Sequence, residues 1–165
     1  MIRRAQYEDI NIIMEIISET VDDLENEGNK QWSESYPAKK HFIQDIMNDS
    51  LYVYLLEDNI AGVISLNSDE NIEYKDAKWR LDQKALVIHR FAVRKAFRRR
   101  KVGTNLVQFA ETKANKECLN YVKVDTNSKN SRMNALFKHL NYQFCGEIYM
   151  GGLKDPFNCY DKILK

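Results

Sequence analysis

The residues best suited to chemistry lie in one cationic segment. Residues 91–106 read FAVRKAFRRRKVGTNL, so an apolar stretch passes into a cluster of cations and then, at Gly103, into apolar residues at helical spacing. No acidic residue lies between Asp82 and Glu111. A helix start leaves backbone N–H groups unpaired and carries a partial positive charge, and flanking arginines add charge-assisted hydrogen bonds. The segment therefore predicts a pyrophosphate site.

The composition shows that this cationic segment is local. The 165 residues include 25 Lys+Arg and 24 Asp+Glu, for a formal net charge of +1. Length and composition suit one compact domain over residues 1–165. No apolar run approaches a membrane span, and the first residues lack the apolar core of a signal peptide, so a cytoplasmic location away from membranes is expected. The widely spaced Cys118, Cys145 and Cys159 predict reduced thiols that mostly serve in packing, with a single reactive thiol among them as the alternative, and no metal site.

Apolar periodicity gives the elements that must position this segment. Strands are predicted at residues 2–5, 51–56, 60–66, 85–93, 121–126, 142–149 and 157–164. Helices are predicted over residues 10–24, from Pro37, from Gly103 and over residues 133–140. In the second helix, the inward face is expected to comprise Phe42, Ile43, Ile46 and Met47. Residues 67–83 show no periodicity and predict a long loop.

This order of elements, with an anion-binding turn between the fourth strand and the third helix, resembles the GNAT superfamily of N-acetyltransferases. Members carry Arg or Gln, two variable positions, Gly, one variable position and then Gly or Ala. Here that register spans residues 98–103, with Lys101 at the first glycine position. If the backbone there needs a positive φ, lysine costs on the order of 1 kcal/mol relative to glycine.

A second stretch carries the same resemblance. Residues 125–130 (DTNSKN) and the following helix are similar to the strand, asparagine and helix that the family places there. The helix ends at Asn141 in place of a glycine, and asparagine still adopts the left-handed cap conformation. The resemblance implies an α+β fold with three α/β/α layers, a mixed and mostly antiparallel seven-stranded sheet, splayed central strands and four helices.

The resemblance also implies an activity, namely transfer of an acetyl group from acetyl-CoA to a primary amine by direct attack in a ternary complex. The backbone of the fourth strand would pair with the pantetheine arm, the basic turn would wrap the pyrophosphate, and an asparagine would contact the arm. The cofactor-binding residues implied are Phe91, Ala92, Val93, Arg98, Arg99, Arg100, Lys101, Val102, Gly103, Thr104, Asn130 and Phe137.

The acid and the base are less well defined by the sequence. His89 is the base candidate, because it is expected on the same strand face as Val87 and Phe91 and has an intrinsic pKa of about 6.5. Alternatively, it is a hydrogen-bonded sheet residue. The family commonly places a tyrosine that acts as the general acid at the position of Phe137. Phenylalanine has no proton to donate. Water, Tyr142 or Tyr160 would then protonate the departing thiolate, or the domain would bind CoA without efficient catalysis.

The acceptor site is expected in the variable segments. Aromatic side chains hold a carbon skeleton and carboxylates attract a cation, which suggests Trp32, Tyr36, Glu70, Glu73, Tyr74 and Trp79. The alternative is that the tryptophans pack loops onto the core while the glutamates are solvated. The acceptor would be a small-molecule or peptide amine, and a homodimer would pair exposed sheet edges.

A nucleic-acid-binding module using Arg94 to Lys101 is the rival interpretation. It is disfavoured because the cations form one short loop without alternating aromatic residues.

Overall fold

The computed structural model describes all residues from Met1 to Lys165. One seven-stranded sheet has the order β1-β2-β3-β4-β5-β7-β6. The strands are β1 (Ile2–Arg4), β2 (Leu51–Leu56), β3 (Asn59–Asn67), β4 (Leu86–Val93), β5 (Tyr121–Asn127), β6 (Gln143–Ile148) and β7 (Phe157–Ile163). The α-helices are α1 (Ile10–Asn26), α2 (Lys39–Met47), α3 (Val102–Lys116) and α4 (Ser131–His139), and short 3-10 helices are η1 (Tyr7–Asp9), η2 (Ile72–Asp76) and η3 (Lys95–Phe97). The predicted fold class is confirmed.

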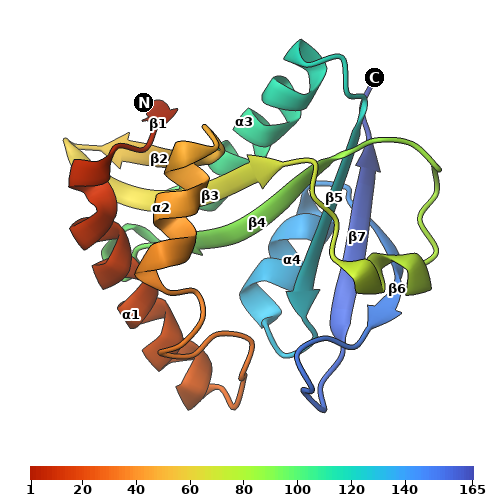
Figure 1. Ribbon diagram of the computed structural model, residues 1–165, viewed down its shortest axis with the longest axis horizontal. Coiled ribbons are helices and arrows are strands. Elements are labelled where there is room, and N and C mark those ends of the chain that lie inside the picture. The colour runs from red at the N-terminus through yellow and green to blue at the C-terminus, as the bar shows by residue number, and fades with distance from the viewer.

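The centre of the sheet is open. All strand pairs are antiparallel except β4 with β5, which pair in parallel only from Leu86↔Val122 to Ile88↔Val124. Beyond Ile88 and Val124 the two strands diverge, as Figure 1 shows. The remaining backbone of β4 therefore faces a gap on its β5 side.

Helices cover both faces of the sheet. In Figure 1, α1 and α2 lie in front of the sheet and α3 and α4 lie behind it. The apolar stripe of α1 packs against β2 and β3 in one core cluster, whereas α3 packs against β4 and β5 in another. Amphipathic spacing explains this arrangement, because each helix has one apolar face to bury. None of these helices has the length and apolar character needed to cross a membrane.

Two local expectations were wrong. Met47 is 64% exposed, whereas Asp45 is only 4% exposed and takes the inward place on α2. The supposed loop of residues 67–83 contains η2, which buries Tyr74 against β4 and β7. Neither feature follows from hydrophobic periodicity, because Asp45 is buried as a charge partner and η2 is a single short turn.

Candidate functional site

A β-bulge shapes β4 where it leaves β5. Val63 pairs with Ala92 but Ser65 pairs with His89, so Arg90 and Phe91 together oppose one residue of β3. Arg90 has a φ of 42°, in the left-handed region. The bulge changes the alternation of side chains along the strand.

This bulge corrects the expected strand face. Val87 packs with Tyr74 in one core cluster, whereas Phe91 packs with Leu106 of α3 in another. His89 therefore does not share a face with Phe91, because the extra residue of the bulge turns Phe91 to the opposite side of the sheet.

A buried ion pair holds the bulge. Arg90 donates from Nε to Asp45 Oδ2 at 2.5 Å and from Nη2 to Asp45 Oδ1 at 2.6 Å. Arg90 Nη1 also donates to the hydroxyl of Tyr36 at 3.4 Å. The pair thus connects α2, the bulge of β4 and the segment that carries Tyr36.

We expect Asp45→Asn to lower the free energy of unfolding by about 3 kcal/mol, because it leaves the Arg90 charge buried without a carboxylate. Urea denaturation measures this loss. Glu15→Gln, which removes an exposed partner of Arg94, should cost less than about 1 kcal/mol. Equal effects of the two changes would contradict the structural role given to Asp45.

The basic turn presents a row of free backbone amides. The N–H groups of residues 99–104 have no acceptor among the turn, loop and cap hydrogen bonds, and no side chain accepts from them. The first helical hydrogen bond of α3 runs from Asn105 N to Lys101 O at 2.9 Å. Arg99 and Lys101 have φ values of 63° and 61°, so the turn twice enters the left-handed region. Free backbone donors at a helix start are suited to a phosphate.

Gly103 makes room behind this row. A Cβ built there would lie 3.2 Å from Leu136 Cδ2 and 3.6 Å from Phe91 Cζ. Glycine therefore allows α3 to pack closely on α4 and β4, which fixes where the amides point.

The cations of the turn fall into two groups. Arg98 pairs with Asp23 at 2.5 Å, and Lys95 pairs with the same carboxylate at 3.1 Å. Arg100 pairs with Glu57. Arg99 and Lys101 are exposed and form none of the ion pairs of the chain. Two cations next to the free amides are thus available to a ligand, whereas a continuous stripe of free charge is not present.

Lys101 lies at the first glycine position of the motif, and its φ of 61° meets the condition for strain. We expect Lys101→Gly to raise the free energy of unfolding by about 1 kcal/mol, measured by urea denaturation. The same change should weaken CoA binding, because it removes a free cation. A variant that gains no stability would show that the left-handed conformation costs lysine nothing here.

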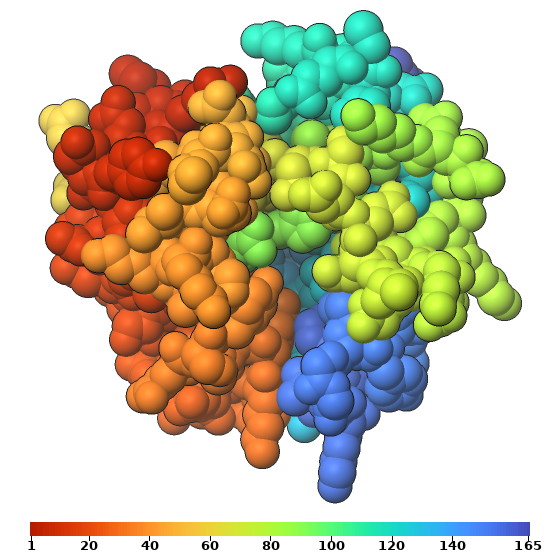
Figure 2. All heavy atoms as spheres, in the orientation of Figure 1, coloured from red at the N-terminus to blue at the C-terminus, as the bar shows by residue number.

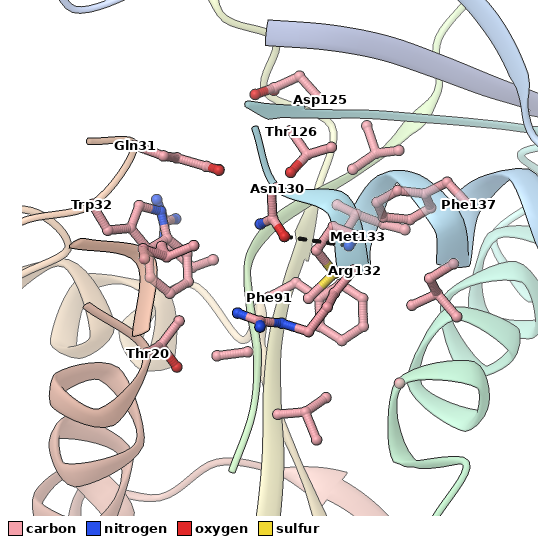
Figure 3. Close-up of a pocket in the computed structure, with 18 of the residues that line it drawn as sticks. Thr20, Gln31, Trp32, Phe91, Asp125, Thr126, Asn130, Arg132, Met133 and Phe137 are labelled. Atoms are coloured by element: carbon pink, nitrogen blue, oxygen red, sulfur yellow. Dashed lines mark hydrogen bonds between the residues drawn. The ribbon is translucent and has the colours of Figure 1, made fainter. Parts of the chain in front are cut away.

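A cavity of about 980 Å³ lies in the gap between β4 and β5. Figure 2 shows its opening as a hollow between the segments near residues 30–45, 70 and 150. Figure 3 shows Trp32, Phe91 and Asn130 approaching the cavity from the α1–α2 segment, β4 and the start of α4. Its size is at the upper end for small-ligand sites.

The structure brings together most of the residues expected to bind the cofactor. Those that line the cavity are Phe91, Ala92, Val93, Arg98, Arg99, Lys101, Val102, Gly103, Thr104, Asn130 and Phe137. Arg100 does not line it and pairs with Glu57 instead. Asn130 caps α4 by accepting from Met133 N at 3.3 Å, shown by the dashed line in Figure 3.

Two titratable side chains stand where β4 and β5 separate. His89 and Asp125 directly follow the last paired residues, Ile88 and Val124, and both line the cavity. The ring nitrogen Nε2 of His89 lies 3.0 Å from the carbonyl of Asp69, and burial lowers the pKa of His89 to about 4. A hydrogen bond to a carbonyl places a proton on Nε2 of the neutral ring.

Asp125 is the residue that the sequence analysis passed over as a candidate base. Burial raises its pKa to about 6, partly offset by a hydrogen bond from the Tyr74 hydroxyl at 2.6 Å. The carboxylate of Glu73 adds a smaller increase. The sequence feature that could have identified Asp125 was its place at the end of a predicted strand, in the stretch that leads to Asn130.

The two tyrosines considered as acids lie away from the cavity. Tyr160 is fully buried and donates to Asn134 Oδ1 at 2.7 Å. Asn134 donates in turn to the carbonyl of Asn130 at 2.8 Å, so this network braces the start of α4. Tyr142 is buried beside Phe137, and burial raises its pKa well above the usual value. Neither tyrosine lines the cavity between the strands.

Only some of the residues expected to bind the acceptor line the cavity. Trp32 and Tyr36 line the cavity, whereas Glu73, Tyr74 and Trp79 do not. Tyr74 is buried behind Asp125, and Trp79 donates from Nε1 to the carbonyl of Tyr74 at 2.7 Å. Glu70 also lies outside the lining and pairs with Lys123 at 2.7 Å.

Comparisons with known proteins agree with this geometry. A Bacillus subtilis (strain 168) relative, described as uncharacterized N-acetyltransferase YesJ, is 24% identical over 148 residues, which cover 86% of this chain and 81% of the relative. The crystal structure of a GNAT-family acetyltransferase from Streptococcus agalactiae aligns with a TM-score of 0.88 and 27% identity, covering 100% of this chain and 95% of that one.

A ribosomal-protein-alanine N-acetyltransferase from Brucella melitensis aligns with a TM-score of 0.73 over 99% of both chains. Its identity of 18% makes this a likeness of fold alone. The model of the acetyltransferase (GNAT) family matches residues 17–142. The chain therefore belongs to the GNAT family and is an N-acetyltransferase.

Proposed function

We propose that this protein transfers an acetyl group from acetyl-CoA to a primary amine by direct attack within a ternary complex. The observation that carries the proposal is the row of free amides over residues 99–104, beside two unpaired cations and opening into the gap between β4 and β5. The GNAT family generally uses acetyl-CoA, which supplies an activated acetyl thioester.

The residues present fit this cofactor. The amides of residues 99–104 hold the pyrophosphate, with Arg99 and Lys101 adding charge. Phe91, Ala92 and Val93 offer the unpaired backbone of β4 to the amide groups of the pantetheine arm, in the manner of an added strand. Asn130 has a side-chain NH2 group left for the same arm, because only its oxygen is used in capping α4.

Asp125 is our proposed general base. A base is most efficient when its pKa lies near the working pH, so a pKa of about 6 suits the task better than the value of about 4 for His89. Asp125 accepts the proton of the ammonium, directly or through one water, and leaves the amine free to attack. His89 is assigned the role of positioning the amine through its ring.

No side chain is assigned as the acid. Phe137 occupies the position at which a tyrosine was expected, and both nearby tyrosine hydroxyls are buried away from the cavity. A thiol has an ordinary pKa of about 8.5, so a departing thiolate takes its proton from water without a strong acid. The apolar Phe137 instead lines the cavity and packs edge-to-face with Phe91.

The rate should depend on pH through Asp125. Because the base must be unprotonated, kcat/KM is expected to fall as the pH drops through about 6. Tyr74→Phe removes a hydrogen bond that lowers the pKa of Asp125, so the acidic limb should move to higher pH. A pH profile of both proteins measures this shift. If the acidic limb does not move in the variant, Tyr74 does not influence the pKa that controls the rate.

Thermal shift and thiol release test the proposal together. CoA at about 100 times its dissociation constant should add roughly 2.7 kcal/mol of stability, whereas duplex DNA should add none. Free thiol should then appear from acetyl-CoA only when an amine is present. Stabilisation by DNA but not by CoA would overturn the assignment.

A further inference from the structure

We infer that Trp79 is a positioning residue for the acetyl transfer, which acts from outside the cavity by holding Tyr74 against Asp125. This inference rests on the proposed function, because Asp125 is the proposed base. It follows from the way in which the segment between β3 and β4 is attached to one face of β5. In Figure 1 that segment crosses in front of β5 and β7.

The face of β5 that carries Asp125 is covered by this segment. Alternation along the strand places Tyr121, Lys123 and Asp125 on the same face. The Tyr121 hydroxyl accepts a hydrogen bond from Leu81 N at 3.3 Å. Asp125 accepts one from the hydroxyl of Tyr74 at 2.6 Å. The segment is therefore bound to β5 at both ends of this row.

The short helix η2 does not hold Tyr74 by itself. Within this turn Tyr74 N donates to Asn71 O at 3.0 Å, and Ala77 N donates to Tyr74 O at 3.2 Å. Such 3-10 turns have poor hydrogen-bond geometry and are used only in short pieces. Tyr74 is nevertheless only 1% exposed. The position of its hydroxyl therefore depends on contacts from outside the turn.

Trp79 supplies these contacts. Its Nε1 donates to the carbonyl of Tyr74 at 2.7 Å, and the centroids of the two rings lie 4.9 Å apart. The indole also interacts with Lys123, whose Nζ lies 4.8 Å from the centroid of the ring. Lys123 is itself buried and pairs with Glu70 at 2.7 Å. Trp79 thus connects both the backbone and the ring of Tyr74 to β5.

Both neighbours of Trp79 in the chain are bound to the sheet. Arg80 donates from its backbone N to Asp161 Oδ2 at 3.1 Å and from Nε to Asp161 Oδ1 at 2.6 Å. Asp161 is fully buried on β7. On the other side of Trp79, Lys78 N donates to the carbonyl of Cys145 on β6 at 2.7 Å. The indole is therefore fixed in place.

The titratable and charged side chains that face Asp125 come from each element packed around it. They are Tyr74 and Glu73 of η2, His89 of β4, Lys123 of β5 and Cys159 of β7. Burial lowers the pKa of His89 and raises that of Cys159, so both are uncharged near neutral pH. Tyr74 lowers the pKa of Asp125, and Glu73 raises it less. Weakening the bond from Tyr74 should therefore raise the pKa of Asp125.

Trp79→Phe tests the inference, since it keeps an aromatic ring and removes the N–H group that binds Tyr74. A hydrogen bond to a charged group is then partly lost, so the acidic limb of kcat/KM should move to higher pH by about half a pH unit. In the Tyr74→Phe protein the same change should move the limb no further. Equal movement in both backgrounds, or no movement in the wild-type background, would overturn the inference.

Ile72→Ala is the control within η2. Ile72 is 75% exposed, so its loss should leave the acidic limb in place. CoA binding should be unchanged in both variants, since neither Trp79 nor Ile72 lines the cavity. An equal movement of the limb in Ile72→Ala would show a general loosening of the turn and would contradict a specific role for Trp79.

NMR titration of isotope-labelled aspartate separates this inference from the proposed function, because it needs neither cofactor nor turnover. Trp79→Phe should raise the pKa of Asp125 measured in the free protein. A raised pKa with an acidic limb that does not move would leave the contact of Trp79, Tyr74 and Asp125 intact and overturn the role of Asp125 as base. An unchanged pKa would overturn the inference and leave the proposed function intact.

Discussion

Replacing Asp125 by asparagine is expected to lower kcat/KM for the amine at least a hundredfold. General base catalysis typically contributes 10²- to 10⁴-fold, and asparagine keeps the shape of the side chain while losing the basic oxygen. The affinity for CoA should change little, because Asp125 stands where the strands separate and not at the amides of residues 99–104. Steady-state rates and calorimetric CoA binding measure the two quantities.

The control for Asp125→Asn is Asp69→Asn, which makes the same chemical change at an exposed residue outside the cavity lining. It should keep the activity within about twofold. His89→Ala is the competing variant, and we expect a smaller loss that appears mainly in KM for the amine. A hundredfold loss in His89→Ala with normal activity in Asp125→Asn would move the role of base to His89.

The second large effect is expected in cofactor affinity. Arg99→Ala and Lys101→Ala should each weaken CoA binding about tenfold, since hydrogen bonds to charged groups contribute roughly 1.5–3 kcal/mol. Arg100→Ala is the matched control in the same turn, because its guanidinium pairs with Glu57 and does not line the cavity. Its affinity for CoA should stay within about twofold of wild type.

Salt gives an independent check of these three variants. The affinity of the wild-type protein should fall with ionic strength more steeply than that of Arg99→Ala or Lys101→Ala, because each variant has one exposed charge fewer to be screened. If Arg100→Ala weakens CoA binding as much as the other two changes, net charge and not the geometry of the turn controls affinity.

The turn and its surroundings could be predicted because they depend on local rules. A strand, a cationic turn and a helix in sequence require only apolar periodicity and the properties of a helix start. The left-handed conformations expected from the family pattern at Lys101 and Asn141 are present, with φ values of 61° and 63°. In both places a residue other than glycine fills a position whose backbone the neighbouring elements determine.

The features that sequence reasoning missed depend on contacts between distant residues. The bulge at Arg90 depends on its ion pair with Asp45, 45 residues earlier in the chain. Asp125 is distinguished by burial and by Tyr74, which is 51 residues away. Strand alternation alone describes a regular ladder, so it placed Phe91 on the wrong face and overlooked a carboxylate in favour of His89.

Aromatic residues show the same limit. Nine tyrosines are present in the sequence, and the type alone does not distinguish a hydroxyl that faces a cavity from one that supports a helix. Tyr160 binds Asn134 within the core, whereas Tyr36 reaches the opening. Only the packing of η2, α4 and the segment between α1 and α2 separates these roles.

A crystal structure of the protein with CoA tests the central claim most directly. We predict that phosphate oxygens of the diphosphate lie within about 3.2 Å of the backbone nitrogens of residues 99–104, with the pantetheine arm between β4 and β5. A complex in which CoA occupies another surface, while these nitrogens face only solvent, would contradict the account.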